Sequence, residues 1–165
     1  MSQNWLITGA GRGFGRAFVS AAAESGAEVY AGVRHVPEGD PLFHSPRVHP
    51  LIFDVTKPGE VNAAVEKALG EAGHIDVLIN NAGFGMSGAF EEMSDEELRG
   101  LMEADYYGAV NVTRAILPSM RGRRGGTILN VASQGGLMGF TGSSAYCSAK
   151  FAVVGLSAAL RMELQ

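Results

Sequence analysis

The chain of 165 residues has one cysteine, Cys147, and few charged side chains. A lone cysteine excludes an internal disulfide and indicates a reducing compartment, so we expect a cytoplasmic protein. Charged residues are 18% of the chain, below the usual ~25%, which argues against wholesale disorder. Every apolar run is shorter than the ~18 residues that a membrane span needs, so we expect no membrane partner.

Positive charge is also scarce. The 13 lysines and arginines face 17 acidic residues, which gives a formal charge of −4, and the longest basic run is Arg123-Arg124. This balance argues against a nucleic-acid partner. The length fits one domain over residues 1–165, which can bury roughly 70% of the surface of its unfolded chain.

Glycine, in contrast, is abundant. There are 23 glycines, about twice the ~7% average share. Four of them fall within Gly9–Gly15 and others gather near residues 83–88, 125–126 and 135–139, without a repeat or a long Gly/Ser run. We therefore interpret the clusters as places where the backbone turns tightly or comes close to a partner, not as low complexity.

Short apolar runs alternate with helical patterns along the whole chain. This order predicts an α/β fold, a Rossmann-like doubly wound parallel sheet of about five strands. Ser94, with Glu97 three residues later, is typical of a capping box that opens a helix. The expected strands are residues 5–7, 28–33, 51–53, 76–80 and 127–131, and the expected helices are residues 14–25, 59–72, about 94–117 and 145–164.

The stretch from His35 to Pro50 has a different composition. It holds four of the six prolines and three of the four histidines. A metal site would need a second ligand at a suitable spacing, and neither a His-x-x-x-His pair nor a cysteine is present. We expect a surface loop here and no bound metal.

A glycine-rich turn lies between the first expected strand and the first expected helix. At this place glycines permit the turn and let backbone N–H groups approach a pyrophosphate, which also meets the positive end of the helix dipole. The position predicts a dinucleotide site rather than an unliganded loop. The residues expected to hold the phosphates are Gly9, Gly11, Arg12, Gly13, Phe14 and Gly15.

The end of the second strand indicates which nucleotide binds. NAD sites place an acidic residue there for the ribose 2′-hydroxyl, whereas an arginine accommodates the 2′-phosphate of NADP. Here the strand ends Val33-Arg34 without an acid, and Arg12 adds a second cation. Either arginine alone is open to interpretation as a solvated side chain; together they favour NADP(H) over NAD(H).

A proton-transfer site is suggested by Tyr146 and Lys150. They are four residues apart, so on a helix they share one face. The lysine ammonium favours the ionised phenol, and such a phenol can give a proton to a carbonyl or take one from an alcohol. Ser133 ends the fifth expected strand, where its hydroxyl can hold the substrate oxygen.

In this order and spacing, these motifs resemble those of the short-chain dehydrogenase/reductase family, from Trp5 to Gln165. The motifs that carry the resemblance are Thr8-Gly-x-x-x-Gly-x-Gly15, Asp54 after the third strand, Asn80-Asn81-Ala82-Gly83 after the fourth, Ser133, and Tyr146-x-x-x-Lys150. The resemblance implies an NADP(H)-dependent oxidoreductase that moves a hydride between nicotinamide and a small-molecule carbonyl or secondary alcohol.

The resemblance also assigns roles. It implies that Tyr146 is the general acid/base, that Ser133 binds the substrate oxygen, and that Lys150 holds the nicotinamide ribose. It places Asp54 and Val55 at the adenine and the turn of Asn81, Ala82 and Gly83 along the cofactor. It further implies a homo-oligomer that pairs through the helices after strands four and five.

Two departures from the family pattern leave alternatives open. Asp105 stands where the family has a catalytic Asn. If its carboxylate reaches Lys150 it partly cancels that charge; otherwise it orders a water as Asn does. The family also continues past Gln165 with two more strands, so strand five becomes a sheet edge. A naturally short member, a truncation and one part of a two-chain protein remain open. So does a nucleotide-binding module with little turnover.

Overall fold

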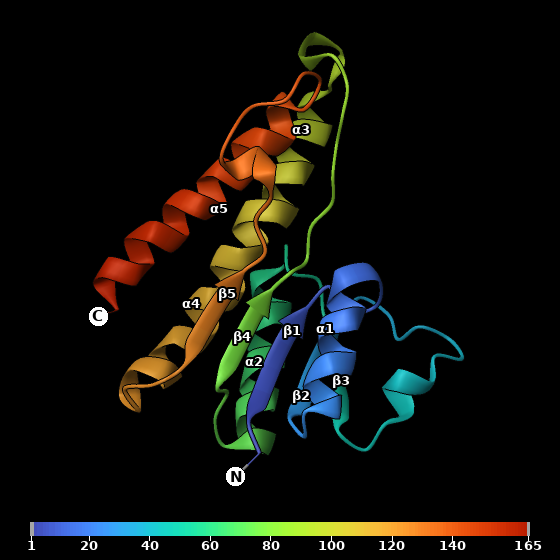
Figure 1. Cartoon of the computed structure of the whole chain (residues 1–165), viewed down its shortest axis with the longest axis vertical. Coiled ribbons are helices and arrows are strands. Elements are labelled where there is room, and N and C mark those ends of the chain that lie inside the picture. Colours follow the sequence, from blue (N-terminus) through green and yellow to red (C-terminus); the bar gives the residue numbers. More distant parts are fainter. Residues whose placement is uncertain (1, 165) are drawn as a thin grey trace.

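The computed structural model describes residues 2–164 and has one five-stranded parallel sheet in the order β3-β2-β1-β4-β5. The strands are β1 (Asn4–Thr8), β2 (Glu28–Val33), β3 (Val48–Ile52), β4 (Val77–Asn80) and β5 (Thr127–Asn130). From β1 the chain winds outward to β3 and then returns to continue with β4 on the other side (Figure 1). The Rossmann-like prediction is confirmed, and in such sheets the crevice for a ligand opens beside this reversal, at the carboxyl ends of the strands.

The helices are α1 (Gly13–Glu24), α2 (Pro58–Ala72), α3 (Asp95–Met102), α4 (Gly108–Gly122) and α5 (Ser144–Glu163), and the 3-10 turns are η1 (Pro41–His44), η2 (Phe90–Glu92) and η4 (Gln134–Gly136). Between α3 and α4 lies a π-helical segment, η3 (Glu103–Tyr107). The predicted capping box is confirmed at the start of α3, where Ser94 Oγ accepts a hydrogen bond from the Glu97 N–H at 3.2 Å.

Both faces of the sheet are covered by helices. Successive strand residues point to opposite faces, so Leu6 joins the core under α2 and α4, whereas Ile7 joins the core under α1. Val65 of α2 and Ile116 of α4 belong to the first core, and Val19 of α1 belongs to the second. The strands are thereby held from both sides, which fixes the position of their carboxyl ends.

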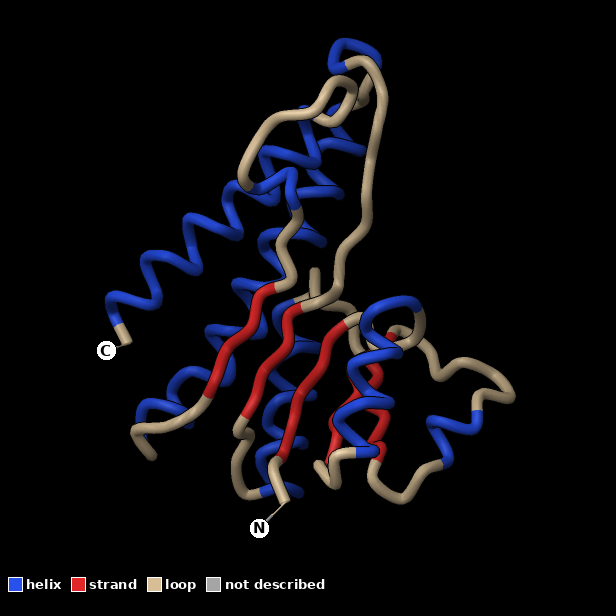
Figure 2. The backbone as a smooth tube through the Cα atoms, viewed as in Figure 1, coloured by secondary structure: helices blue, strands red, loops and turns tan. Residues whose placement is uncertain are grey.

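The loops after β4 and β5 leave the sheet and run up into an arm formed with α3 and the start of α5 (Figure 2). The Gly88 N–H donates to the Gly142 carbonyl at 2.9 Å and joins the two loops. Several large apolar side chains in these loops are exposed; they are Phe84, Phe90, Leu137, Met138 and Phe140. The carboxyl end of the sheet therefore faces a space bordered by the arm.

Most predicted boundaries differ from the structure by one residue, but two were wrong by more. The third strand begins at Val48, not Leu51, and includes Pro50 opposite Ala31. Proline is tolerated because β3 is an edge strand, where one side of the backbone needs no partner. The loop predicted to reach Pro50 therefore ends earlier and also contains η1.

The helix predicted to end near Leu117 continues through Pro118 to Gly122. A proline inside a helix cannot donate to the carbonyl four residues earlier. Here both Pro118 and Arg114, the residue that owns that carbonyl, are exposed, so solvent can hydrate the group that proline leaves unpaired.

Within residues 2–164 no helix combines the length and the apolar character that crossing a membrane requires. Over the same residues, no group of three or more His, Cys, Asp or Glu side chains is arranged to hold a metal ion. Cys147 is a free, buried thiol on α5.

Candidate active site

A cleft with a volume of about 1170 Å³ lies at the carboxyl ends of the strands. Most of the residues singled out from the sequence line it. They are Gly9, Gly11, Arg12, Gly13, Phe14, Arg34, Asp54, Val55, Asn81, Ala82, Gly83, Asp105, Ser133, Tyr146 and Lys150. Gly15 is not on the wall of the cleft, and its role is structural, as described next.

The glycine turn brings strand β1 and helix α1 into close contact. A Cβ at Gly15 would lie 2.1 Å from the Gly9 carbonyl oxygen, so no larger residue fits there. Gly9 and Gly13 adopt φ values of +63° and +54°, in the left-handed region that favours glycine. Nothing lies within 4 Å of the Cβ position of Gly13, so the backbone here faces open space.

Helix α1 begins in this open space without a side-chain cap. Its N-cap residue is Arg12, which makes no side-chain hydrogen bond to the helix. The first N–H groups of a helix have no partner within it, and they carry the positive end of the helix dipole. The free end of α1 beside the cleft therefore fits the phosphates of a dinucleotide.

Asn81 and Thr8 brace the turn from the side. The Asn81 amide donates to the carbonyls of Thr8 and Gly9 at 3.0 and 3.2 Å. The Thr8 hydroxyl accepts from the N–H groups of Asn81 and Ala82 at 3.0 and 3.1 Å. Sequence analysis placed Thr8 at the start of the glycine motif but did not assign it this bracing role.

One end of the cleft carries positive charge. Arg12, Arg34 and His35 all line it near the glycine turn. Asp54 lines the same region, and burial alone would raise its pKa. Two hydrogen bonds from Thr56, with the nearby charges of Arg34 and Lys57, outweigh the burial and hold the pKa of Asp54 below its ordinary value. Asp54 is thus a carboxylate placed to accept hydrogen bonds.

Val55, the other residue predicted at the adenine, is held by α4. The Asn111 amide donates to the Val55 carbonyl at 3.0 Å. A Cβ at Gly108 would lie 2.7 Å from Val55 Cγ2, so the helix approaches the cleft wall through this glycine. Asn111, which is out of register with the family's catalytic Asn, thereby has a structural role.

The other end of the cleft brings Ser133, Tyr146 and Lys150 together. Lys150 Nζ lies 5.6 Å from the centre of the Tyr146 ring and donates to the Val131 carbonyl at 3.3 Å. Ser133 follows β5, and its hydroxyl accepts from the Gly135 N–H at 3.2 Å, which leaves its own proton free to donate. Ser133 and Tyr146 both line the cleft, and each has a hydroxyl group that can donate a hydrogen bond to a carbonyl oxygen.

Asp105 pairs directly with Lys150. Its Oδ2 lies 3.1 Å from Lys150 Nζ, and the two side chains are 0% and 8% exposed. Its Oδ1 accepts a hydrogen bond from the Phe84 N–H at 2.8 Å. Of the two alternatives left open by the sequence, the structure therefore has the direct contact between carboxylate and ammonium.

Comparisons with known proteins identify the family. The model of the short chain dehydrogenase family matches residues 3–165. A 3-ketodihydrosphingosine reductase from Bacteroides thetaiotaomicron is 42% identical over 159 residues, which are 96% of this chain and 57% of that protein. The chain belongs to the short-chain dehydrogenase family.

Solved structures agree with this assignment. The crystal structure of a short-chain dehydrogenase from Streptomyces avermitilis superimposes with a TM-score of 0.95 at 39% identity, covering 99% of this chain and 61% of that one. ElxO with NADP bound superimposes with a TM-score of 0.94 at 29% identity, covering 99% and 68%. The chain thus spans between 57% and 68% of the length of these three proteins.

Proposed function

We propose that this chain is an NADP(H)-dependent oxidoreductase that interconverts a ketone and a secondary alcohol. The observation that carries the proposal is the single cleft, which joins the open glycine turn to the cluster of Ser133, Tyr146 and Lys150. By their printed names one of the relatives above is a reductase and another a dehydrogenase, and the structure of ElxO has NADP bound.

The residues at the two ends of the cleft have different roles. The free N–H groups of α1 hold the pyrophosphate, and Arg12 and Arg34 hold the 2′-phosphate. The bound nicotinamide supplies or accepts the hydride. Asp54 and Val55 border the adenine, and Asn81, Ala82 and Gly83 lie along the nucleotide.

At the other end, Ser133 donates a hydrogen bond to the substrate oxygen and holds it beside Tyr146. The Tyr146 hydroxyl gives its proton to that oxygen during ketone reduction and takes it back during alcohol oxidation. Lys150 favours the ionised phenol through its positive charge and donates to the nicotinamide ribose. The exposed Leu137, Met138 and Phe140 favour an apolar substrate.

Substitution of Tyr146 by Phe tests the proton transfer. We expect Tyr146→Phe to lower the rate of ketone reduction at least about a hundredfold while NADPH still binds, because only the hydroxyl is lost. Tyr107→Phe is the matched control, since Tyr107 is exposed on η3 and does not line the cleft. Equal rates for Tyr146→Phe and the wild type would contradict the assignment.

The second candidate function is a nucleotide-binding module with little turnover. It is favoured by the direct contact of Asp105 with Lys150, because the carboxylate partly cancels the charge that favours the ionised phenol. NADPH binding with no ketone reduction by either the wild type or Tyr146→Phe would support it.

A homo-oligomer that pairs through α4 and α5 is also part of the proposal. Light scattering with and without NADPH measures the oligomeric state.

A further inference from the structure

Asp105 and Lys150 are the two buried charged residues among the residues that the structure describes. A buried charge is costly unless it is paired, and these two side chains lie in direct contact. Asp105 Oδ2 lies 3.1 Å from Lys150 Nζ but receives no hydrogen bond from any described residue. A buried acceptor of this kind requires an explanation.

The carboxylate also bonds to the turn after β4. Asp105 Oδ1 accepts from the Phe84 N–H, and a Cβ at Gly83 would lie 2.9–3.1 Å from the atoms of the carboxyl group. Gly83 thus lets the turn approach Asp105 closely. One side chain on η3 therefore connects the cleft-lining turn to the lysine on α5.

Both neighbours of the carboxylate are hydrogen donors, and this distinguishes Asp from Asn. A carboxylate has two acceptor oxygens, whereas an amide has one acceptor and one NH₂ donor. An Asn at position 105 would turn its NH₂ either toward the Phe84 N–H or toward Lys150 Nζ. In this geometry the amide oxygen can accept a hydrogen bond from only one of these two donors.

We propose that Asp105 is a positioning residue for the proton-transfer step, holding Lys150 beside Tyr146 and balancing its charge. The inference rests on the proposed function and concerns the residues of the chain itself. Nζ contacts Asp105 Oδ2 at 3.1 Å and donates to the Val131 carbonyl at 3.3 Å. Nζ also lies 5.6 Å from the centre of the Tyr146 ring.

Among residues 2–164, no other charged side chain is buried beside Lys150. The elements packed against α5 are η4, which has no charged residue, together with η3 and α3. The half-buried Tyr106 and the exposed Tyr107 are the remaining phenols on η3. The charged residues on η3 and α3 other than Asp105 are exposed; they are Asp95, Glu96, Glu97, Arg99 and Glu103. Across the cleft lie Arg12, Arg34, His35 and Asp54.

The first test measures the reactivity of Lys150, which depends on its pairing with Asp105 and does not require catalysis. The chain has three lysines, and Lys57 and Lys67 are exposed internal references. Reductive methylation followed by mass spectrometry gives the rate at each lysine. In the wild type we expect Lys150 to react at least about tenfold more slowly than the references, because it is buried and paired.

The change Asp105→Asn should raise the reaction rate at Lys150 several-fold and leave Lys57 and Lys67 unchanged. Glu103→Gln removes the same charge from an exposed position on the same π-helical segment and is the matched control. An unchanged Lys150 rate in Asp105→Asn would overturn the proposal. If that variant does not fold, the double variant Asp105→Asn/Lys150→Met decides: recovery of folding supports the pair, and continued failure to fold contradicts it.

The second test uses the pH profile of cyclohexanol oxidation. Removal of the carboxylate charge lets the lysine favour the phenolate more strongly, so the rising limb should move to lower pH by about one unit in Asp105→Asn. A purely structural role would lower the rate equally at every pH without moving the limb, and that result would refute the positioning role. If the wild type oxidises no alcohol, the proposed function fails, while the lysine rates still decide whether the pair exists.

Discussion

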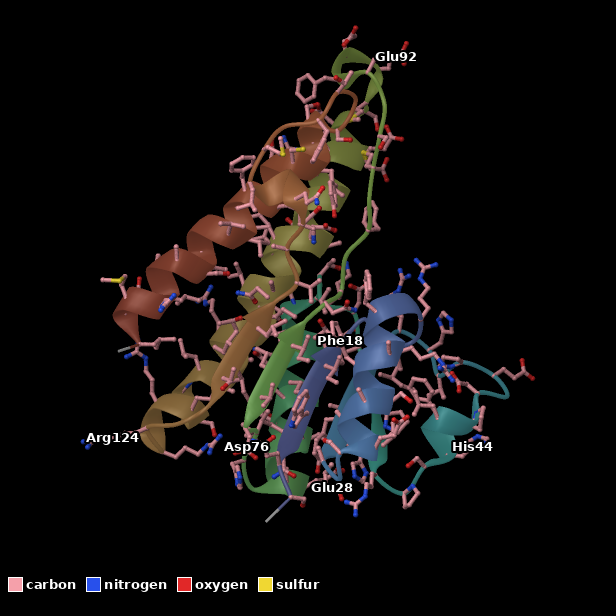
Figure 3. The ribbon with its side chains drawn as sticks, in the orientation of Figure 1. Phe18, Glu28, His44, Asp76, Glu92 and Arg124 are labelled. Carbon is pink, nitrogen blue, oxygen red and sulfur yellow. The ribbon has the colours of Figure 1, made fainter. Side chains whose placement is uncertain are left out.

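Charged side chains pair differently at the two ends of the strands. The amino edge is the end of the sheet where the strands begin, and the carboxyl edge is the end where they finish. At the amino edge, Glu28 pairs with Arg47 and His49, and Asp76 pairs with Arg123, all with partly exposed side chains. Figure 3 shows the labelled Glu28, Asp76 and Arg124 at this edge, far from Glu92 on the arm. At the carboxyl edge, Asp105 and Lys150 form a buried pair.

The two edges differ in how much the loss of one partner of an ion pair destabilises the fold. Exposed ion pairs contribute about 0–1 kcal/mol, because water already solvates both partners. A buried pair does not make a fold more stable than an apolar pair would, but breaking it leaves a charge without a partner. The buried pair thus lies at the end of the sheet where we propose that the reaction takes place, whereas the pairs of the amino edge are partly exposed.

The largest expected effect comes from breaking the buried pair. Asp105→Ala leaves Lys150 buried without a counter-charge and removes the acceptor of the Phe84 N–H. We expect the free energy of unfolding to fall by about 3–5 kcal/mol. Glu28→Ala at the amino edge should cost about 1 kcal/mol or less. Urea unfolding measures both, and equal losses would remove the contrast between the edges.

Glycine substitutions compare the backbone at the two edges. Gly15→Ala places a Cβ 2.1 Å from the Gly9 carbonyl oxygen, a backbone atom that cannot move alone. We expect a loss of about 3 kcal/mol and weaker NADPH binding. Gly73, which ends α2 at the amino edge, has φ +76° and open space around it. Gly73→Ala should cost about 1 kcal/mol, through its left-handed backbone alone. A Gly15→Ala variant as stable as Gly73→Ala would show that the close approach is not required.

Removal of cations tests how the carboxyl edge recognises the nucleotide. Arg34→Ala should weaken NADPH binding about tenfold and leave NADH binding unchanged, because only the 2′-phosphate contact is lost. Arg47→Ala removes a cation from the amino edge and should change neither affinity. Fluorescence titration with both nucleotides measures the two constants. Equal weakening of NADPH and NADH would mean that Arg34 does not read the 2′-phosphate.

The smallest expected effect concerns a partly exposed pair at the carboxyl edge, between Arg16 on α1 and Asp40. The guanidinium of Arg16 donates to Asp40 Oδ2 at 2.6 Å, and the Leu42 N–H also donates to this carboxylate. Chiefly through the bond from Arg16, the pKa of Asp40 falls from 3.8 to about 2. A depressed pKa stabilises the folded state at pH values above the ordinary pKa of the carboxyl group. This contribution is lost as the pH falls toward 2.

NMR titration of the Asp40 carboxyl carbon should therefore give a midpoint near 2. Arg16→Met should raise this midpoint toward 3.8, its ordinary value, whereas Arg47→Met should leave it in place. An unchanged midpoint in Arg16→Met would mean that another group holds the carboxylate in its ionised form. The comparison of the two variants therefore shows whether the contact with Arg16 is what lowers the pKa of Asp40.

The sequence by itself determined the local features of this protein. The glycine turn, the capping box at Ser94 and the order of strands and helices depend on backbone conformations that each residue type prefers, so neighbouring residues suffice to predict them. The motif spacing also indicated which residues would lie near the cleft, since strand ends in a parallel sheet meet at one edge.

The tertiary structure decided what depends on distant parts of the chain. The edge position of β3 permits Pro50 within a strand, and α4 continues past Pro118 because that residue is exposed. Only the fold brings Asp105 to both Phe84 and Lys150. Through-space pairing and burial depend on how separate elements pack, and local sequence preferences carry no information about that packing.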